Sequence, residues 1–186
     1  MFGIDLGITV SSVTCTNPKN ELIDHFIIFG DQGGRNYWKR IIDMTEHLTD
    51  TVQNICKSNP DIRISPLVAI EEPVFPFRTR NPQSYFNTCC LYALVRNKLT
   101  VRGFTIYSIH PLTAKMIAKQ IFKGKRLKET LMKRGSLTKA GMIRAFEKLH
   151  GKPPDYHTKV GRETLADSFF IAQAGIEKRR LGLGLK

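Results

Sequence analysis

Four acidic side chains lie in apolar surroundings, in three separate parts of this 186-residue chain. Asp5 interrupts a short apolar run at the start of the sequence, and Glu71 follows the apolar run Leu67–Ile70. Glu163 and Asp167 stand four residues apart near the other end. Carboxylates buried in an apolar core repel one another and take up protons unless a cation neutralises them. The pattern therefore indicates a site in which several carboxylates meet.

Spacing places Glu163 and Asp167 on one face of a helix that we expect at residues 161–178. Phe170 and Ala174 continue the same face. That face is therefore expected to point into the protein rather than into water.

Most of these acids have a plainer explanation when each is taken alone. Asp5 could serve in a turn or as a cap, and Glu71 could face solvent where its strand ends. Glu163 could be a first-turn residue that the helix dipole favours. Asp167 is harder to explain in this way, because it lies mid-helix between Ala166 and two phenylalanines. The combination is more specific than any single acid.

Oxygen ligands without a cysteine and histidine set favour Mg²⁺ or Mn²⁺ over Zn²⁺. Two such ions about 3.5–4 Å apart can activate water and stabilise the leaving oxygen during cleavage of a phosphodiester. We therefore expect Asp5, Glu71, Glu163 and Asp167 to hold two Mg²⁺ ions, for which Mn²⁺ could substitute.

The charge balance points to a polyanionic partner. The chain has 29 Lys and Arg against 16 Asp and Glu, a formal net charge of +13. Such an excess suits nucleic acid first and an anionic membrane second. No apolar run approaches the roughly 20 residues of a spanning helix, and no secretory signal is visible, so we expect no membrane partner. The four cysteines are expected to be reduced, in a cytoplasmic or nucleoid protein of bacterial, phage or organellar origin.

Hydrophobic periodicity and turn residues predict a series of strands and helices. We expect strands at the N-terminus, 11–16 and 21–29; a helix at 36–57; a strand at 67–70; a helix at 82–99; a strand at 104–109; and helices from 111, at 137–150 and at 161–178. Antiparallel strands followed by strands that alternate with helices indicate a mixed α/β fold.

Two helix starts are marked by capping residues. Asn81 is expected to cap the helix that begins at Pro82, and Ser136 the helix that begins at Leu137.

The whole chain, 1–186, is expected to be one domain with a basic C-terminal tail.

The segments FGIDLG, VAIEEPVF and ETLADSFFIA, in this order, resemble the RuvC-type Holliday junction resolvases of the ribonuclease H superfamily. The resemblance implies a ribonuclease H-like fold with a five-stranded mixed sheet flanked by helices. It matches Asp5 to the first-strand acid, Glu71 to the acid after the fourth strand and Asp167 to the last-helix acid. Thr164 occupies the position of the family's other last-helix acid or histidine, so Glu163 is the expected substitute.

Two lysines strengthen the resemblance. Lys115 is similar to the family lysine that approaches the scissile phosphate, and Lys139 to a second lysine at the start of the following helix. A lysine at that phosphate would stabilise developing negative charge. Both residues could also be ordinary surface lysines.

The loop after Glu71 resembles the family region in which an aromatic side chain contacts bases near the crossover. Stacking of this kind tolerates any base sequence. Basic residues in this loop and in a later basic stretch are candidates for phosphate contacts. The expected DNA-binding residues are Phe75, Phe77, Arg78, Arg80, Lys123, Lys125, Arg126 and Lys128.

The resemblance implies an endonuclease that cuts four-way DNA junctions with paired symmetric nicks and leaves 5′-phosphate and 3′-hydroxyl ends. Two symmetric cuts imply a homodimer, with the helix from Pro82 as the dimer face. Three alternatives stay open: a ribonuclease H-like enzyme for flaps or RNA–DNA hybrids, an actin- or chaperone-like ATPase, and a junction-binding protein that has lost catalysis.

Overall fold

The computed structural model describes residues 1–17, 19, 21–30, 36–59, 66–74, 81–122, 130–133 and 135–182. Every strand and helix expected from the sequence is present in it. The elements are β1 (Phe2–Asp5), β2 (Val10–Thr16), β3 (Leu22–Phe29), α1 (Tyr37–Ser58), β4 (Leu67–Glu71), α2 (Pro82–Val101), β5 (Thr105–Ile109), α3 (Pro111–Gln120), β6 (Met132–Lys133), β7 (Ser136–Leu137), α4 (Lys139–His150) and α5 (Lys159–Arg180).

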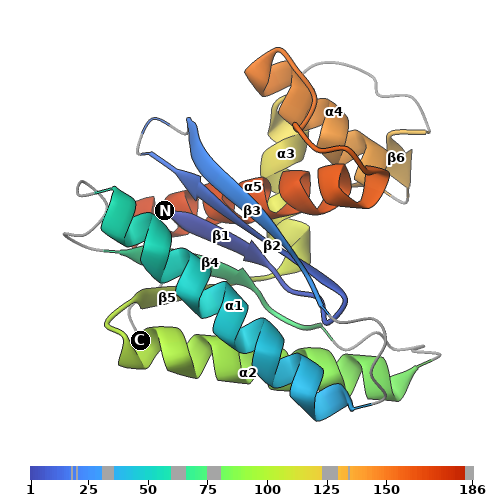
Figure 1. The fold of residues 1–186 in the computed structure, drawn as a ribbon. Coiled ribbons are helices and arrows are strands. Elements are labelled where there is room, and N and C mark those ends of the chain that lie inside the picture. Colours follow the sequence, from blue (N-terminus) through green and yellow to red (C-terminus); the bar gives the residue numbers. More distant parts are fainter. Residues whose placement is uncertain are drawn as a thin grey trace.

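Five strands form one mixed sheet in the order β3-β2-β1-β4-β5 (Figure 1). β1, β2 and β3 are antiparallel neighbours, whereas β4 runs parallel to both β1 and β5. The five-stranded mixed sheet expected from the sequence is therefore confirmed. β6 and β7 form a separate small hairpin.

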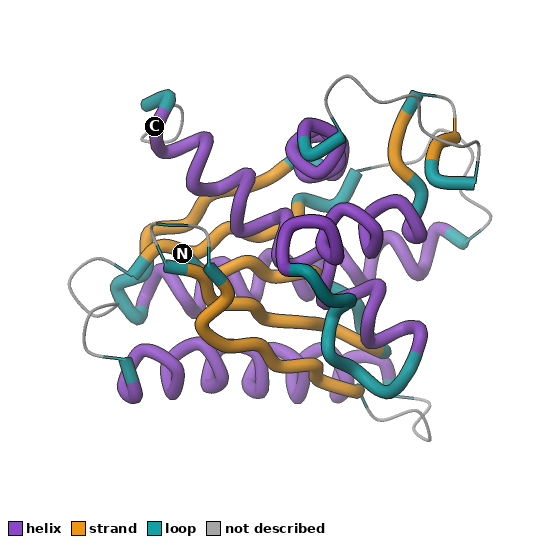
Figure 2. Tube along the Cα trace, turned by 90° about the horizontal axis from the view of Figure 1, so that it is seen from above, coloured by secondary structure: helices purple, strands orange, loops and turns teal. Residues whose placement is uncertain are grey.

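Helices cover both faces of the sheet, as Figures 1 and 2 show. α1 and α2 pack on one face, where the apolar side chains of β1 point. α5 crosses the other face of the sheet over β1, β2 and β4. α3 and α4 pack against α5. The first and last elements of the fold are thus in direct contact.

The start of α4 differs from the expectation. Thr138, not Ser136, is the N-cap, because its Oγ1 accepts a hydrogen bond from the Gly141 N–H at 3.1 Å and donates one to the Thr130 carbonyl at 2.9 Å. Ser136 instead pairs with Lys133 in the small hairpin. The helix consequently begins at Lys139, with that lysine in its first position.

The last helix is also longer than expected. α5 begins at Lys159, where the Thr158 side chain accepts a hydrogen bond from the Gly161 N–H at 3.1 Å.

No helix in the described part of the chain is long and apolar enough to span a bilayer.

Candidate active site

Alternation along β1 directs Asp5 toward α5. Phe2 and Ile4 are buried on the side of α1 and α2, so Gly3 and Asp5 face the opposite layer. A Cβ on Gly3 would lie 2.0 Å from the carbonyl oxygen of Ser168, so no side chain fits between β1 and α5. This close approach of two backbones sets the carboxylates of β1 and α5 near each other.

Parallel pairing places Glu71 beside Asp5. Ile4 pairs with Ile70, so the next residue of each strand lies at the same carboxyl edge of the sheet. Asp5 and Glu71 share a hydrogen bond between their carboxyl groups. Two segments that are far apart in sequence therefore meet in a carboxyl pair.

A cavity of about 210 Å³ opens at this edge and is called the acid cavity below. Five of the six residues expected to be catalytic line it: Asp5 from β1, Glu71 from β4, Lys115 from α3, Lys139 from α4 and Asp167 from α5. The remaining lining residues are Pro111, Ala114, Met142 and Ile171.

The three carboxyl groups hold protons more tightly than in water. Burial raises the pKa of Asp5 to about 7, and the negative charge of Glu71 adds to this rise. Burial, followed by the charge of Asp5, raises the pKa of Asp167 to about 7. Burial and the charge of Asp167 raise the pKa of Glu71. Mutual repulsion of this kind is relieved by a nearby cation.

Both lysines act against these shifts. The positive charge of Lys139 lowers the pKa of all three carboxyls, and Lys115 lowers that of Glu71 and Asp167. Lys139 Nζ lies 3.8 Å from Asp167 Oδ2, although its side chain is 60% exposed. Lys139 therefore contacts the acids and is also accessible to an incoming ligand.

Glu163 stands apart from the acid cavity. It lies one helical turn before Asp167, 3.7 Å from Lys139 Nζ and 4.0 Å from Lys159 Nζ. Thr164 is buried, and its carbonyl accepts a hydrogen bond from Ser12 Oγ at 2.8 Å. Thr164 thus serves helix packing, and Glu163 is the acid next to the cavity.

A divalent cation fits the chemistry of these donors. Among the described residues, no three His, Cys, Asp or Glu side chains are grouped closely enough to bind a metal ion as they stand. Asp5, Glu71 and Asp167 are nevertheless hard oxygen donors around one cavity, and each raises the pKa of another by repulsion. Such donors favour Mg²⁺ or Mn²⁺.

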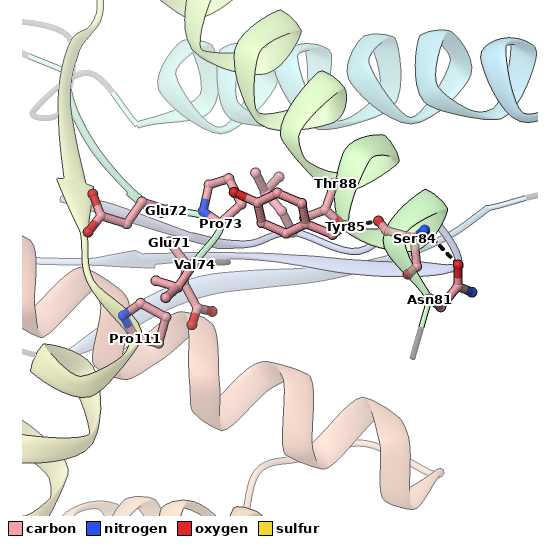
Figure 3. Close-up of a pocket in the computed structure, with 10 residues that line it drawn as sticks. Glu71, Glu72, Pro73, Val74, Asn81, Ser84, Tyr85, Thr88 and Pro111 are labelled. Carbon is pink, nitrogen blue, oxygen red and sulfur yellow. Dashed lines mark hydrogen bonds between the residues drawn. The ribbon is translucent and has the colours of Figure 1, made fainter. Parts of the chain in front are cut away.

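A larger hollow of about 530 Å³ lies beside the acid cavity (Figure 3) and is called the Tyr85 hollow. It shares Glu71 and Pro111 with that cavity and extends to Ser84 and Thr88 on α2. Figure 3 shows the Tyr85 ring over this space. Sequence analysis missed these α2 residues, although the N-cap at Asn81 already placed a helix start close behind Glu71 in the chain.

The eight residues expected to bind DNA are in segments that the structure does not describe. Phe75, Phe77, Arg78, Arg80, Lys123, Lys125, Arg126 and Lys128 lie outside the described residues. Their roles stay predictions.

No protein-family model and no curated protein matches this sequence. Thermus thermophilus RuvC matches the structure with a TM-score of 0.65 at 17% identity, over 98% of this chain and 96% of that chain. This chain has the RuvC fold. This match and the strand order of the sheet confirm the ribonuclease H-like fold expected from the sequence.

Two further solved structures share the RuvC fold. Thermus thermophilus RuvC in complex with a Holliday junction substrate matches with a TM-score of 0.64 at 16% identity, over 98% of this chain and 96% of that one. The yeast mitochondrial Holliday junction resolvase Ydc2 matches with a TM-score of 0.56 at 13% identity, over 96% of this chain and 78% of that chain. At such identities the likeness concerns the fold.

Proposed function

We propose that this protein is a metal-dependent endonuclease that resolves four-way DNA junctions. The observation that carries the proposal is the meeting of Asp5, Glu71 and Asp167, from three elements, in one cavity of a RuvC fold. The net charge of +13 supports a nucleic-acid substrate. The solved neighbours support this substrate class, since one is bound to a Holliday junction and another is a junction resolvase.

The carboxylates of Asp5, Glu71 and Asp167 would hold Mg²⁺ ions, with Glu163 as a fourth ligand and Mn²⁺ as a substitute. When bound, the ions supply Lewis acidity and an activated water for attack on the phosphate. Lys139 and Lys115 line the same cavity as the three acids, and they would stabilise the negative charge that develops on the phosphate oxygens. The expected products carry 5′-phosphate and 3′-hydroxyl ends.

A two-fold homodimer would deliver the paired symmetric nicks that junction resolution requires. We place its interface on α2 and the adjoining surface of α1. Large apolar side chains are exposed there: Trp38, Ile42, Phe86, Leu94 and Val101. A dimer would remove this apolar surface from water. Such an enzyme would act wherever DNA recombines, in the cytoplasm, the nucleoid or an organelle.

A cleavage assay on a panel of substrates tests the proposal. Labelled four-way junction, flap, duplex and RNA–DNA hybrid are incubated with the protein, with and without Mg²⁺. We expect paired cuts in the junction with Mg²⁺ and none in EDTA. Preference for the flap or the hybrid would identify a different ribonuclease H-like nuclease. Junction binding without cleavage would refute an active nuclease, and ATP turnover by the same sample would support an ATPase.

A further inference from the structure

A third hollow continues the row formed by the acid cavity and the Tyr85 hollow. Its volume is about 310 Å³, and it is called the Arg40 cavity here. It shares Asn81, Ser84 and Thr88 with the Tyr85 hollow. Its other side is formed by Gly7–Thr9, the turn that directly follows Asp5 and Leu6. Their shared lining residues show that the three hollows run from the carboxylates past the start of α2 to the start of α1.

Arg40 is the only charged side chain among the residues described as lining this third cavity. Its Nε–H is buried and has no hydrogen-bond acceptor among the residues that the structure describes. The guanidinium contacts the ring of Tyr37, with Cζ 5.8 Å from the ring centroid. A buried donor without an acceptor costs free energy, so this group favours a ligand that supplies an anionic oxygen.

Asn87 adds a second donor to the same cavity. Its side chain is 4% exposed, although it lies on the second turn of α2. The Asn87 Oδ1 accepts a hydrogen bond from Gln83 Nε2 at 2.8 Å, so the amide N–H groups are the part left for another partner. A buried amide whose oxygen already accepts one hydrogen bond can still donate its N–H groups to an anion.

We propose that the Arg40 cavity binds a phosphodiester group of the same DNA strand that is cut at the acid cavity. The inference rests on the proposed nuclease function and extends it by a binding site. The Tyr85 hollow between the two cavities is lined by Leu6, Val74 and the Tyr85 ring, and its 530 Å³ gives room for the intervening nucleoside. Arg40 and Asn87 would then fix the position of the strand, so that the scissile phosphate lies over Asp5.

Arg40→Gln, compared with Arg96→Gln, tests this site. Both variants lose one positive charge, but Arg96 is exposed on α2 and lines none of the three hollows. Binding of a fluorescein-labelled four-way junction is measured by anisotropy in EDTA over a series of salt concentrations. We expect Arg40→Gln to weaken binding on the order of tenfold relative to Arg96→Gln, and to lower the salt slope by about 0.9. Asn87→Asp, which places a carboxylate in the cavity, should also weaken binding.

The Arg40 Nε–H NMR signal, assigned by its loss in Arg40→Gln, reports on the site itself. The junction should shift this signal at concentrations where inorganic phosphate does not. A shift by inorganic phosphate alone, with none from DNA, would mean a free-phosphate site and would overturn the proposal. Equal junction binding by Arg40→Gln and Arg96→Gln would overturn it as well.

The two proposals fail in different ways. If Arg40→Gln binds and cuts junctions as Arg96→Gln does, the phosphate site is wrong and the nuclease stands. If binding depends on Arg40 but no substrate in the panel is cut, the nuclease is wrong and the strand-binding site stands. Circular dichroism melting of each variant separates either result from a loss of folding.

Discussion

Asp5 and Asp167 are held close together against their own repulsion. Each has a pKa of about 7, because burial and the neighbouring carboxyl both disfavour the charged form. Such an arrangement lowers the stability of the fold at neutral pH, and stability is commonly given up at functional sites. The unfavourable pairing is thus best explained by a ligand of opposite charge.

Asp5→Asn should abolish cleavage and leave junction binding intact. The amide keeps the shape of the side chain but removes a negative oxygen donor from the acid cavity, so the rate should fall by about a thousandfold or more. Cleavage is measured by gel with Mg²⁺, and binding by anisotropy in EDTA. An active Asp5→Asn protein would remove Asp5 from the mechanism.

Glu163→Gln should have a milder effect. Glu163 contacts Lys139 and Lys159 rather than the cavity itself, so its loss should weaken Mg²⁺ binding more than it slows the chemical step. We expect the Mg²⁺ concentration for half-maximal cleavage to rise severalfold, with the rate at saturating Mg²⁺ within about tenfold of wild type. Asp167→Asn is the reference variant. If Glu163→Gln and Asp167→Asn lose cleavage activity equally, Glu163 does not play the lesser role expected here.

The stability of the metal-free protein should fall as pH rises from about 4 to about 8. Folded Asp5 and Asp167 titrate near 7, whereas unfolded aspartate titrates near about 3.9, so the folded state binds more protons between these values. The free energy of unfolding in EDTA should decrease by on the order of a few kcal/mol over this range and level off above it.

Urea titrations at pH 5 and pH 8 measure this dependence. Asp167→Asn should flatten it, whereas Asp43→Asn, on the exposed side of α1, should keep the wild-type slope. Identical slopes in the two variants would show that the acid cavity does not control stability.

Elements assemble the site through close backbone contact. Gly3 admits the Ser168 carbonyl of α5, and farther along the same helix a Cβ on Gly175 would lie 2.6 Å from Ala69 Cβ of β4. Small residues on both sides therefore let α5 lie directly on β1 and β4. The positions of Asp5, Glu71 and Asp167 follow from this contact.

Gly3→Ala should destabilise the fold and slow cleavage together. The added methyl group would meet the Ser168 carbonyl at 2.0 Å and push α5 away from β1, at a cost of about 1–3 kcal/mol. Denaturant unfolding and gel cleavage measure the two effects. Thr100→Ala is the control, because Thr100 is exposed on α2. Equal stability of both variants would contradict the packing argument.

Sequence patterns found the acids and the individual strands because both leave local signals, whereas the five-stranded sheet was implied by the family resemblance. Asp5 interrupts one apolar run and Glu71 follows another, and the face shared by Asp167 and Phe170 follows from helical spacing. The pairing of Ser136 with Lys133, which moved the helix cap to Thr138, depends on a contact across a turn that periodicity does not show. Arg40 gave no signal for the same reason, since its importance comes from the cavity that α1 and α2 form together.

The whole molecule presents two contrasting surfaces. The hollows at the carboxyl ends of β1 and β4 carry acids, lysines and Arg40. The outer surface of α1 and α2 instead exposes apolar side chains, with Trp38 and Phe86 in an edge-to-face contact at 6.4 Å between ring centroids. One surface suits a polyanion and the other a second protein chain.

Leu94→Glu should convert the proposed dimer into a monomer. Leu94 is 38% exposed on α2, and a charge there would be buried unpaired in the interface. Sedimentation velocity measures the mass of both forms. Leu149→Glu, at an exposed apolar position on α4, should stay dimeric. A wild-type protein that is monomeric at all concentrations would exclude the dimer. A dimeric Leu94→Glu protein would mean that the interface lies elsewhere.

The docking of α5 onto β1 also bears on protein synthesis. Asp5 is translated before α5, which is the last of the described elements. A nascent chain that still lacks this helix has Asp5 and Glu71 but not Asp167, and it offers a ligand no complete site. If the protein is a nuclease, its site is therefore completed only after α5 has been synthesised and has docked on β1.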